Sequence, residues 1–173
     1  MLAGPMDYTP GGFDNATKEE FKISWSDPMV MGTRVHQLAL YVVYESPLQM
    51  VADHPGAIRN KPGSQFIKTV PASWDETRYL KGKIGDYIVM ARRNGEKWFV
   101  GALTDWSSRN IQLPLDFLGE GPYKAVMYKD GPDTEKSPKE VQIIQKEVIS
   151  TDLINAKLTS GGGFSAYFLP SEK

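Results

Sequence analysis

The chain has 173 residues, enough for one ordinary domain or for one compact domain plus part of another. Its 20 Lys and Arg residues nearly balance its 21 Asp and Glu residues, and neither sign forms a long run, so we expect no nucleic-acid partner and no attachment to an anionic membrane. Cysteine is absent, which excludes disulfides, thiolate catalysis and Cys-ligated metals. With 40% hydrophobic residues, the composition is that of a folded, soluble protein.

Two further absences bear on targeting. No apolar run approaches the roughly 20 residues of a membrane-spanning helix. The first residues lack the basic start and apolar stretch of a secretory signal, so we expect no signal peptide in this chain.

The first seventy residues indicate mixed helix and strand. A short extended piece ending near Asp7 is followed by loop residues up to Phe13, where Pro10, Gly11 and Gly12 interrupt any regular element. Apolar residues then recur at three-four spacing from Gly32 to Tyr44, which predicts a helix that Pro47 ends. The mostly apolar stretch Leu48–Ala52 predicts a short buried strand, closed by the turn residues Asp53–Gly56.

After residue 71 the pattern changes to short strands at close spacing. Eight stretches are rich in β-branched and aromatic residues: Arg78–Lys81, Tyr87–Arg92, Lys97–Leu103, Ile111–Phe117, Tyr123–Tyr128, Val141–Val148, Leu153–Leu158 and Phe164–Leu169. The Asn94-Gly95 pair favours a type I′ hairpin, so the strands on either side should pair antiparallel. This pattern predicts an antiparallel sandwich or barrel of about a hundred residues.

Several ordered motifs resemble glycoside hydrolase family 97. The stretches Gly4–Gly11, Thr33–Met50 and Asp53–Pro55 resemble the end of that family's catalytic barrel. Val70–Arg78 and Gly85–Arg93 are similar to its passage into a C-terminal β domain. The resemblance covers essentially the whole chain, and long motifs in the correct order are more specific than any single one.

The resemblance implies the C-terminal part of an α-glucosidase or α-galactosidase that is exported to the periplasm and binds calcium. In this family the catalytic carboxylates and the calcium ligands lie upstream of the segment matching Gly4–Gly11, so no residue here inherits those roles. We therefore expect no catalytic residue, metal ligand or cofactor in this chain. It should supply a wall of the pocket for an oligo- or disaccharide and a surface for homo-oligomer assembly, and be inactive alone. Glucoside or galactoside specificity, and inverting or retaining chemistry, stay open.

The expected fold is an α+β fragment with two parts. Residues 1–72 would be the incomplete end of a (β/α)8 catalytic barrel, contributing one β-α-β unit built from the strand before Asp7, the helix and the strand Leu48–Ala52. Residues 73–173 would be an antiparallel, sandwich-like β domain with a role in oligomerisation. A closed barrel needs about 200 residues or more, so this chain cannot form one, and the open edge must be covered by other protein.

Four residues are candidates for sugar binding. Barrel enzymes carry their chemistry on loops at the carboxyl ends of the strands, which would place Asp7, Tyr8, Asp53 and His54 on the substrate side. They could hydrogen-bond sugar hydroxyls, and Tyr8 could lie against a sugar face. The structural alternative is that Asp7 caps a turn and that His54 merely precedes Pro55 in a bend.

Other polar motifs indicate no site. The adjacent carboxylates Glu19-Glu20 and Asp75-Glu76 cannot flank one glycosidic bond, because that chemistry needs carboxyl groups about 5 Å apart or more on opposite sides of it. The two histidines, His36 and His54, are too far apart to form a metal-binding motif, and His36 is expected to be structural.

A free-standing carbohydrate-binding β-sandwich module is the alternative function. It is suggested by aromatic residues that could stack on sugars, namely Trp74, Trp98, Phe99, Trp106, Tyr123 and Tyr128. Alternating strands bury half of their side chains, so most of these rings are expected in the core or at a domain interface.

Overall fold

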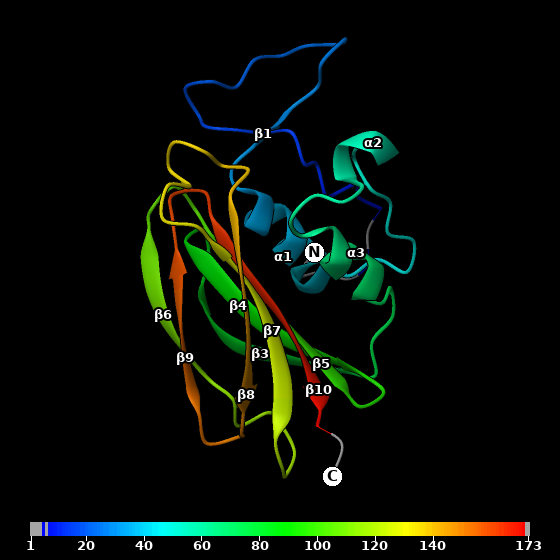
Figure 1. Ribbon diagram of the computed structural model, residues 1–173, viewed down its shortest axis with the longest axis vertical. Helices are drawn as coiled ribbons and strands as arrows, with labels where there is room; N and C mark the ends of the chain where they lie inside the picture. Colours follow the sequence, from blue (N-terminus) through cyan, green and yellow to red (C-terminus); the bar gives the residue numbers. More distant parts are fainter. Residues whose placement is uncertain (1–4, 6, 172–173) are drawn as a thin grey trace.

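The computed structural model, which describes residue 5 and residues 7–171, places one long helix against a face of a six-stranded antiparallel sheet (Figure 1). The helices are α1 (Arg34–Val43), α2 (Pro55–Ile58) and α3 (Ser64–Thr69). The strands are β1 (Asn15–Ala16), β2 (Val30–Met31), β3 (Glu76–Lys83), β4 (Tyr87–Asn94), β5 (Lys97–Thr104), β6 (Arg109–Pro114), β7 (Tyr123–Asp130), β8 (Val141–Val148), β9 (Leu153–Leu158) and β10 (Gly163–Pro170). None of the described helices is long and apolar enough to span a membrane.

The main sheet has the strand order β3-β4-β5-β10-β7-β8, and β6 pairs with β9 in a separate two-stranded sheet. All of these pairings are antiparallel. Side chains from β4, β5, β7 and β10 pack with those of β6 and β9 in one apolar core, which includes Trp98, Val100, Phe164 and Phe168. The predicted antiparallel sandwich-like architecture is confirmed.

Each of the eight stretches predicted as strands overlaps one strand, with bounds that differ by a few residues. The hairpin of β4 and β5 is also confirmed, but its turn is not type I′. Asn94 pairs with Lys97 in the ladder, which leaves Gly95 and Glu96 as the two turn residues. Only Gly95 has a positive φ, of 58°, whereas type I′ needs positive φ at both positions.

Helix α1 confirms the helix predicted between Gly32 and Tyr44, shortened at both ends. Gly32, at a φ of 97°, lies outside the helix, and the Thr33 side chain accepts a hydrogen bond from the His36 amide as N-cap. Capping of this kind satisfies one of the amides that the first helical turn leaves without a partner. Tyr44 is the C-cap.

The helix lies close to the sheet because glycines face it. A Cβ atom on Gly101 of β5 would lie 2.8 Å from the Ala39 carbonyl oxygen, and one on Gly163 of β10 would lie 2.8 Å from the His36 Cα. Around these contacts a second apolar cluster joins the residues before 72 to the sheet. It includes Phe13, Val35, Leu38, Tyr41, Val42 and Phe66 on one side and Phe99, Val126, Tyr128 and Tyr167 on the other.

The predicted strand Leu48–Ala52 is wrong for this chain, and the β-α-β unit is not confirmed. Residues 48–52 form no β ladder with any described strand. Their backbone contacts instead include Ala52 N–H donating to the Pro10 carbonyl. The first strand of the unit falls mostly in residues 1–4 and 6, outside the described residues.

Candidate functional site

One pocket collects two of the sequence candidates. It has a volume of about 860 Å³, and α2 and the loop between β1 and β2 both contribute residues to its lining. These two elements lie at the top of Figure 1. We term it the upper pocket. It is lined by Thr9, Phe13, Asp14, Ser26, Asp27, Pro28, Arg34, Val51, Ala52, Asp53, His54, Gly56, Ala57, Lys61 and Lys139.

Asp53 connects the segment before β1 to the segment before α2. Its Oδ2 accepts a hydrogen bond of 2.8 Å from the Phe13 amide, and its Oδ1 accepts one of 2.8 Å from the His54 amide. His54 is the N-cap of α2, because its Nδ1 accepts a hydrogen bond of 3.0 Å from the Gly56 amide. A neutral ring that accepts at Nδ1 carries its proton on Nε2. That leaves Nε2–H of an exposed side chain to donate to a ligand.

Tyr8 lies at a different place, the C-terminal end of α1. Its hydroxyl lies 3.2 Å from the Leu40 carbonyl oxygen and 3.0 Å from that of Tyr44, and it accepts a hydrogen bond of 3.4 Å from Gln49 Nε2. Burial raises the pKa of the Tyr8 phenol to about 12. The Tyr8 hydroxyl therefore lies beside two carbonyls at the end of α1: that of Leu40, which also accepts the Tyr44 amide, and that of Tyr44, which lies beyond the last helical hydrogen bond. Asp7 is exposed and does not line the upper pocket.

Replacing Tyr8 by Phe should therefore destabilise the chain without weakening any sugar binding in the upper pocket. Loss of the hydroxyl removes the donor to the Tyr44 carbonyl, while the Leu40 carbonyl keeps the Tyr44 amide, and we expect a loss of about 1 kcal/mol of unfolding free energy. Urea denaturation measures the loss, and a sugar titration of the same variant measures the binding. Weaker sugar binding with unchanged stability would instead make Tyr8 a ligand contact.

Sequence reasoning missed a buried cation in the upper pocket. The Arg34 guanidinium lies 4.7 Å from the centre of the Phe13 ring and donates a hydrogen bond of 2.8 Å to the Phe13 carbonyl. Burial lowers the pKa of Arg34, while the charges of Asp14 and Asp53 oppose that shift. Lys139 forms an ion pair with Asp14 at the same pocket. No local motif predicts these contacts, because the paired residues are far apart in the sequence and meet only in the folded chain.

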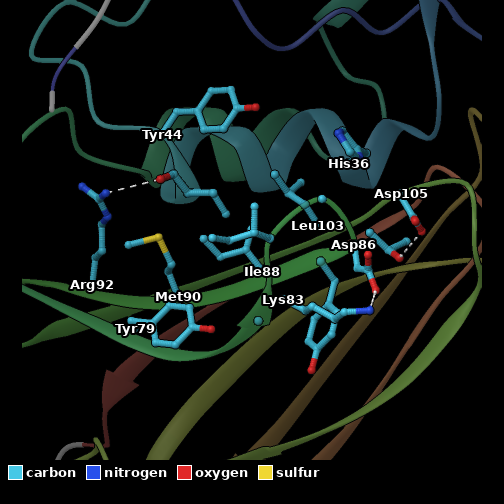
Figure 2. A pocket seen from close by; sticks show the side chains of 16 residues that line it. His36, Tyr44, Tyr79, Lys83, Asp86, Ile88, Met90, Arg92, Leu103 and Asp105 are labelled. Atoms are coloured by element: carbon cyan, nitrogen blue, oxygen red, sulfur yellow. Dashed lines mark hydrogen bonds and ion pairs between the residues drawn. The ribbon is translucent and has the colours of Figure 1, made fainter. Parts of the chain in front are cut away.

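A second pocket, the lateral pocket, lies between α1 and the β3–β4 hairpin and has a volume of about 380 Å³ (Figure 2). Its rim includes Tyr79 and Ile84, whose side chains are 62% and 91% exposed. Arg92 closes one end by donating to the Val43 carbonyl. His36 Nδ1 lies 3.1 Å from the Gly162 carbonyl oxygen, and burial lowers the pKa of its ring. His36 is thus a hydrogen-bonded structural histidine.

The aromatic residues of the β domain are mostly buried. Trp98, Phe99, Tyr123 and Tyr128 are each less than 9% exposed, and Trp74 packs edge-on against Phe99. Only Trp106 of this set is as much as 44% exposed. A sugar-binding platform on the β domain is therefore not favoured. Within residue 5 and residues 7–171, no group of three or more His, Asp or Glu side chains could hold a metal ion.

Comparison with known proteins identifies close relatives. The sequence model of the family described as "Glycosyl-hydrolase 97 C-terminal, oligomerisation" matches residues 73–169. A retaining α-galactosidase of Bacteroides thetaiotaomicron is 42% identical over 166 residues, which are 95% of this chain and 25% of that protein. A probable retaining α-galactosidase of Streptomyces bingchenggensis is 30% identical over 95% of this chain and 24% of its own length.

Solved structures give the same result. A glycoside hydrolase family 97 enzyme from a Pseudoalteromonas strain, in complex with panose, superposes with a TM-score of 0.88 at 37% identity. The match covers 99% of this chain and 27% of that one. A β-arabinopyranosidase structure matches 79% of this chain and 21% of its own at 28% identity, with a TM-score of 0.67. The chain thus spans about a quarter of the length of the relatives it matches.

Proposed function

Because the chain belongs to glycoside hydrolase family 97, with residues 73–169 matching the C-terminal domain of that family, we propose that it forms one wall of the sugar pocket in an enzyme that hydrolyses α-galactosides or α-glucosides. The observation that carries this proposal is the upper pocket, which Asp53 and His54 line together with residues 26–28 of the β1–β2 loop. Retaining α-galactosidases and an enzyme bound to panose are among the relatives, and both substrate classes stay within the proposal.

Residues 48–52 support a contact with further protein. Leu48 is 64% exposed, and Met50 and Val51 are exposed beside it, so a mostly apolar segment lies open to solvent with few backbone partners. Exposed apolar residues with unpaired backbone groups are what a neighbouring strand would cover. We propose that residues 1–72 complete the last β-α-β unit of a (β/α)8 barrel and that other strands of the barrel pair with residues 48–52.

The chain alone should not turn over substrate. Hydrolysis needs one carboxyl group to protonate the leaving oxygen and a second to act as nucleophile or base across the scissile bond. We expect no release of nitrophenol from nitrophenyl α-galactoside or α-glucoside, with or without calcium. Calcium, which the resemblance implies for the whole enzyme, would be held outside the described residues of this chain. Calcium-dependent turnover that is lost in Asp7→Asn or Asp53→Asn would contradict the assignment and make that residue catalytic.

The wall itself is tested by the two histidines, whose ring protons give separate NMR signals. His54 lines the upper pocket, whereas His36 lies in the lateral pocket and hydrogen-bonds to Gly162. Titration with panose, or with the α-galactoside melibiose, should shift the His54 signals and leave those of His36 in place. Equal shifts of both, or of neither, would remove the upper pocket from the sugar site.

Self-association is the second part of the proposed role. The family description includes oligomerisation, and Tyr79 and Ile84 are exposed apolar side chains inside the matched range. An assembly that covered them and the lateral pocket would remove apolar area from water. The mass of the intact chain by light scattering tests this part independently of sugar binding.

A further inference from the structure

The loop between β1 and β2 carries the most exposed aromatic side chain of the described residues. Trp25 is 99% exposed and Ile23 is 89% exposed, on a segment that projects from the upper end of the molecule (Figure 1). Burying a tryptophan removes a large apolar area from water and stabilises a fold. Because Trp25 is fully exposed, its ring adds no such stability to this chain. Such a ring is available to a ligand.

Hydrogen bonds hold the loop in a defined turn. The Ser24 hydroxyl accepts a hydrogen bond of 3.0 Å from the Asp27 amide, which closes the turn that carries Trp25. At the start of the loop, the Thr17 hydroxyl accepts one of 3.2 Å from the Glu20 amide. Local side-chain to backbone bonds of this kind fix turns without any apolar core. The indole is thus presented on a built turn.

The position of this turn connects Trp25 to the upper pocket. Ser26, Asp27 and Pro28, which follow Trp25 directly, line that pocket together with Asp53 and Lys61. A pyranose ring has an apolar C–H face and a rim of hydroxyl groups. Trp25 does not line the pocket itself, but its flat indole precedes, by one residue, a pocket lined by carboxylate, hydroxyl and ammonium groups, so the two together offer both kinds of contact.

A protein partner would need a different surface. Protein interfaces have a contiguous apolar centre surrounded by a polar rim. Here the two apolar side chains, Ile23 and Trp25, alternate with Lys22, Ser24 and Ser26 along the chain. That polar setting leaves one ring as the main apolar contact, which fits a sugar ring better than a protein surface.

We propose that Trp25 is a stacking platform for a pyranose ring of an α-linked oligosaccharide whose adjoining unit occupies the upper pocket. The proposal rests on the proposed function and extends it from the pocket wall to a second sugar contact. It predicts that oligosaccharides long enough to reach both places bind more tightly than monosaccharides.

Fluorescence of a Trp106→Phe variant tests the proposal. Trp106 is the other well-exposed tryptophan, at 44%, whereas Trp98 is buried at 4% and Trp74 is partly buried. Replacing Trp106 therefore leaves Trp25 as the one well-exposed tryptophan of the described residues. Titration with panose or melibiose should shift the emission to the blue, because stacking shields the indole from water. In the otherwise unchanged chain, Trp25→Ala should weaken sugar binding about tenfold, which corresponds to about 1.4 kcal/mol. Trp25→Phe, which keeps a ring, should bind more tightly than Trp25→Ala.

The histidine signals separate this proposal from the proposed function. Suppose that sugar shifts the His54 signals, that the Trp25 emission stays constant and that Trp25→Ala binds sugar as tightly as the unchanged chain. This result would overturn the platform and leave the pocket wall intact. A Trp25 response without a His54 shift would keep the platform and contradict the wall. Tyr79→Ala, at the lateral pocket, is the matched control for loss of an exposed ring, and a loss of affinity equal to that of Trp25→Ala would overturn the proposal.

Discussion

A chain shortened to residues 74–173 is expected to fold, to be much less stable than the intact chain and to self-associate. The core between the six-stranded sheet and the β6–β9 pair lies wholly within this segment, so the sandwich keeps its main apolar cluster. The other face of the sheet loses its cover. Phe99, Tyr128 and Tyr167 pack against α1, Phe13 and Phe66 in the intact chain. Burial of a large side chain is worth about 1.5–3 kcal/mol, so uncovering three removes on the order of 5 kcal/mol.

Guanidinium denaturation of both chains measures the difference in stability, and light scattering measures the association. The control is the shortened chain with Phe99→Ser and Tyr167→Thr, which lie on the uncovered face and should make it monomeric without touching the main core. A shortened chain that is unfolded would show that the helix layer and the sandwich are one integrated fold. A shortened chain that is monomeric and as stable as the intact chain would show that the layer containing α1 contributes nothing to the stability of the sandwich.

The main β elements could be predicted from the sequence because local signals determine them. Turn residues such as Gly95 mark the hairpins, and β-branched and aromatic residues fill the strands between them. The layer that covers the sheet could not be predicted in the same way. Trp98, Phe99 and Val100 of β5 are all apolar and buried, so the alternation that normally separates a covered face from a wet one is missing. Only the structure shows that Phe99 faces α1 and Trp98 faces the sandwich core.

The failed strand prediction has a related cause. Residues 48–52 have the composition of a buried strand, but a strand exists only when another strand supplies hydrogen-bonding partners. The composition of a segment indicates that it could form a strand, but it does not show whether a partner strand is present.

Only part of the candidate site could be predicted from the sequence. Asp53 and His54 follow one another in the chain, so a single turn brings them together. Arg34 and Lys139 reach the same pocket through tertiary packing, and Tyr8 is drawn away to the end of α1 by the carbonyls there. Trp25 gave no periodic signal, and its exposure becomes apparent only in the folded chain.

Asp130 is the residue whose single replacement should destabilise the chain most. It ends β7, is 8% exposed, and its Oδ2 accepts hydrogen bonds of 3.0 Å and 2.9 Å from the Thr159 amide and hydroxyl and of 3.1 Å from the Gly163 amide. The turn held in this way contacts the start of α1, where the Gly161 carbonyl accepts from the Thr33 amide. Asp130→Ala leaves three buried donors unpaired and should cost about 3–5 kcal/mol. The exposed Asp116→Ala is the control and should change stability by at most about 0.5 kcal/mol.

The pH dependence of stability separates the charge of Asp130 from its hydrogen bonds. Burial raises the pKa of the Asp130 carboxyl above its ordinary value of 3.8, against the opposing effect of the hydrogen bonds it accepts. A group whose pKa is higher in the folded state binds protons more tightly there, so its contribution to stability decreases as pH rises from the unfolded pKa through the folded one. Asp130→Asn keeps a carbonyl acceptor and removes the charge. Its stability deficit relative to the intact chain should therefore shrink as pH rises from about 4 to about 8, as urea midpoints at each pH would show. A deficit that grows over this range would mean that the negative charge stabilises the turn, contrary to the effect of its burial.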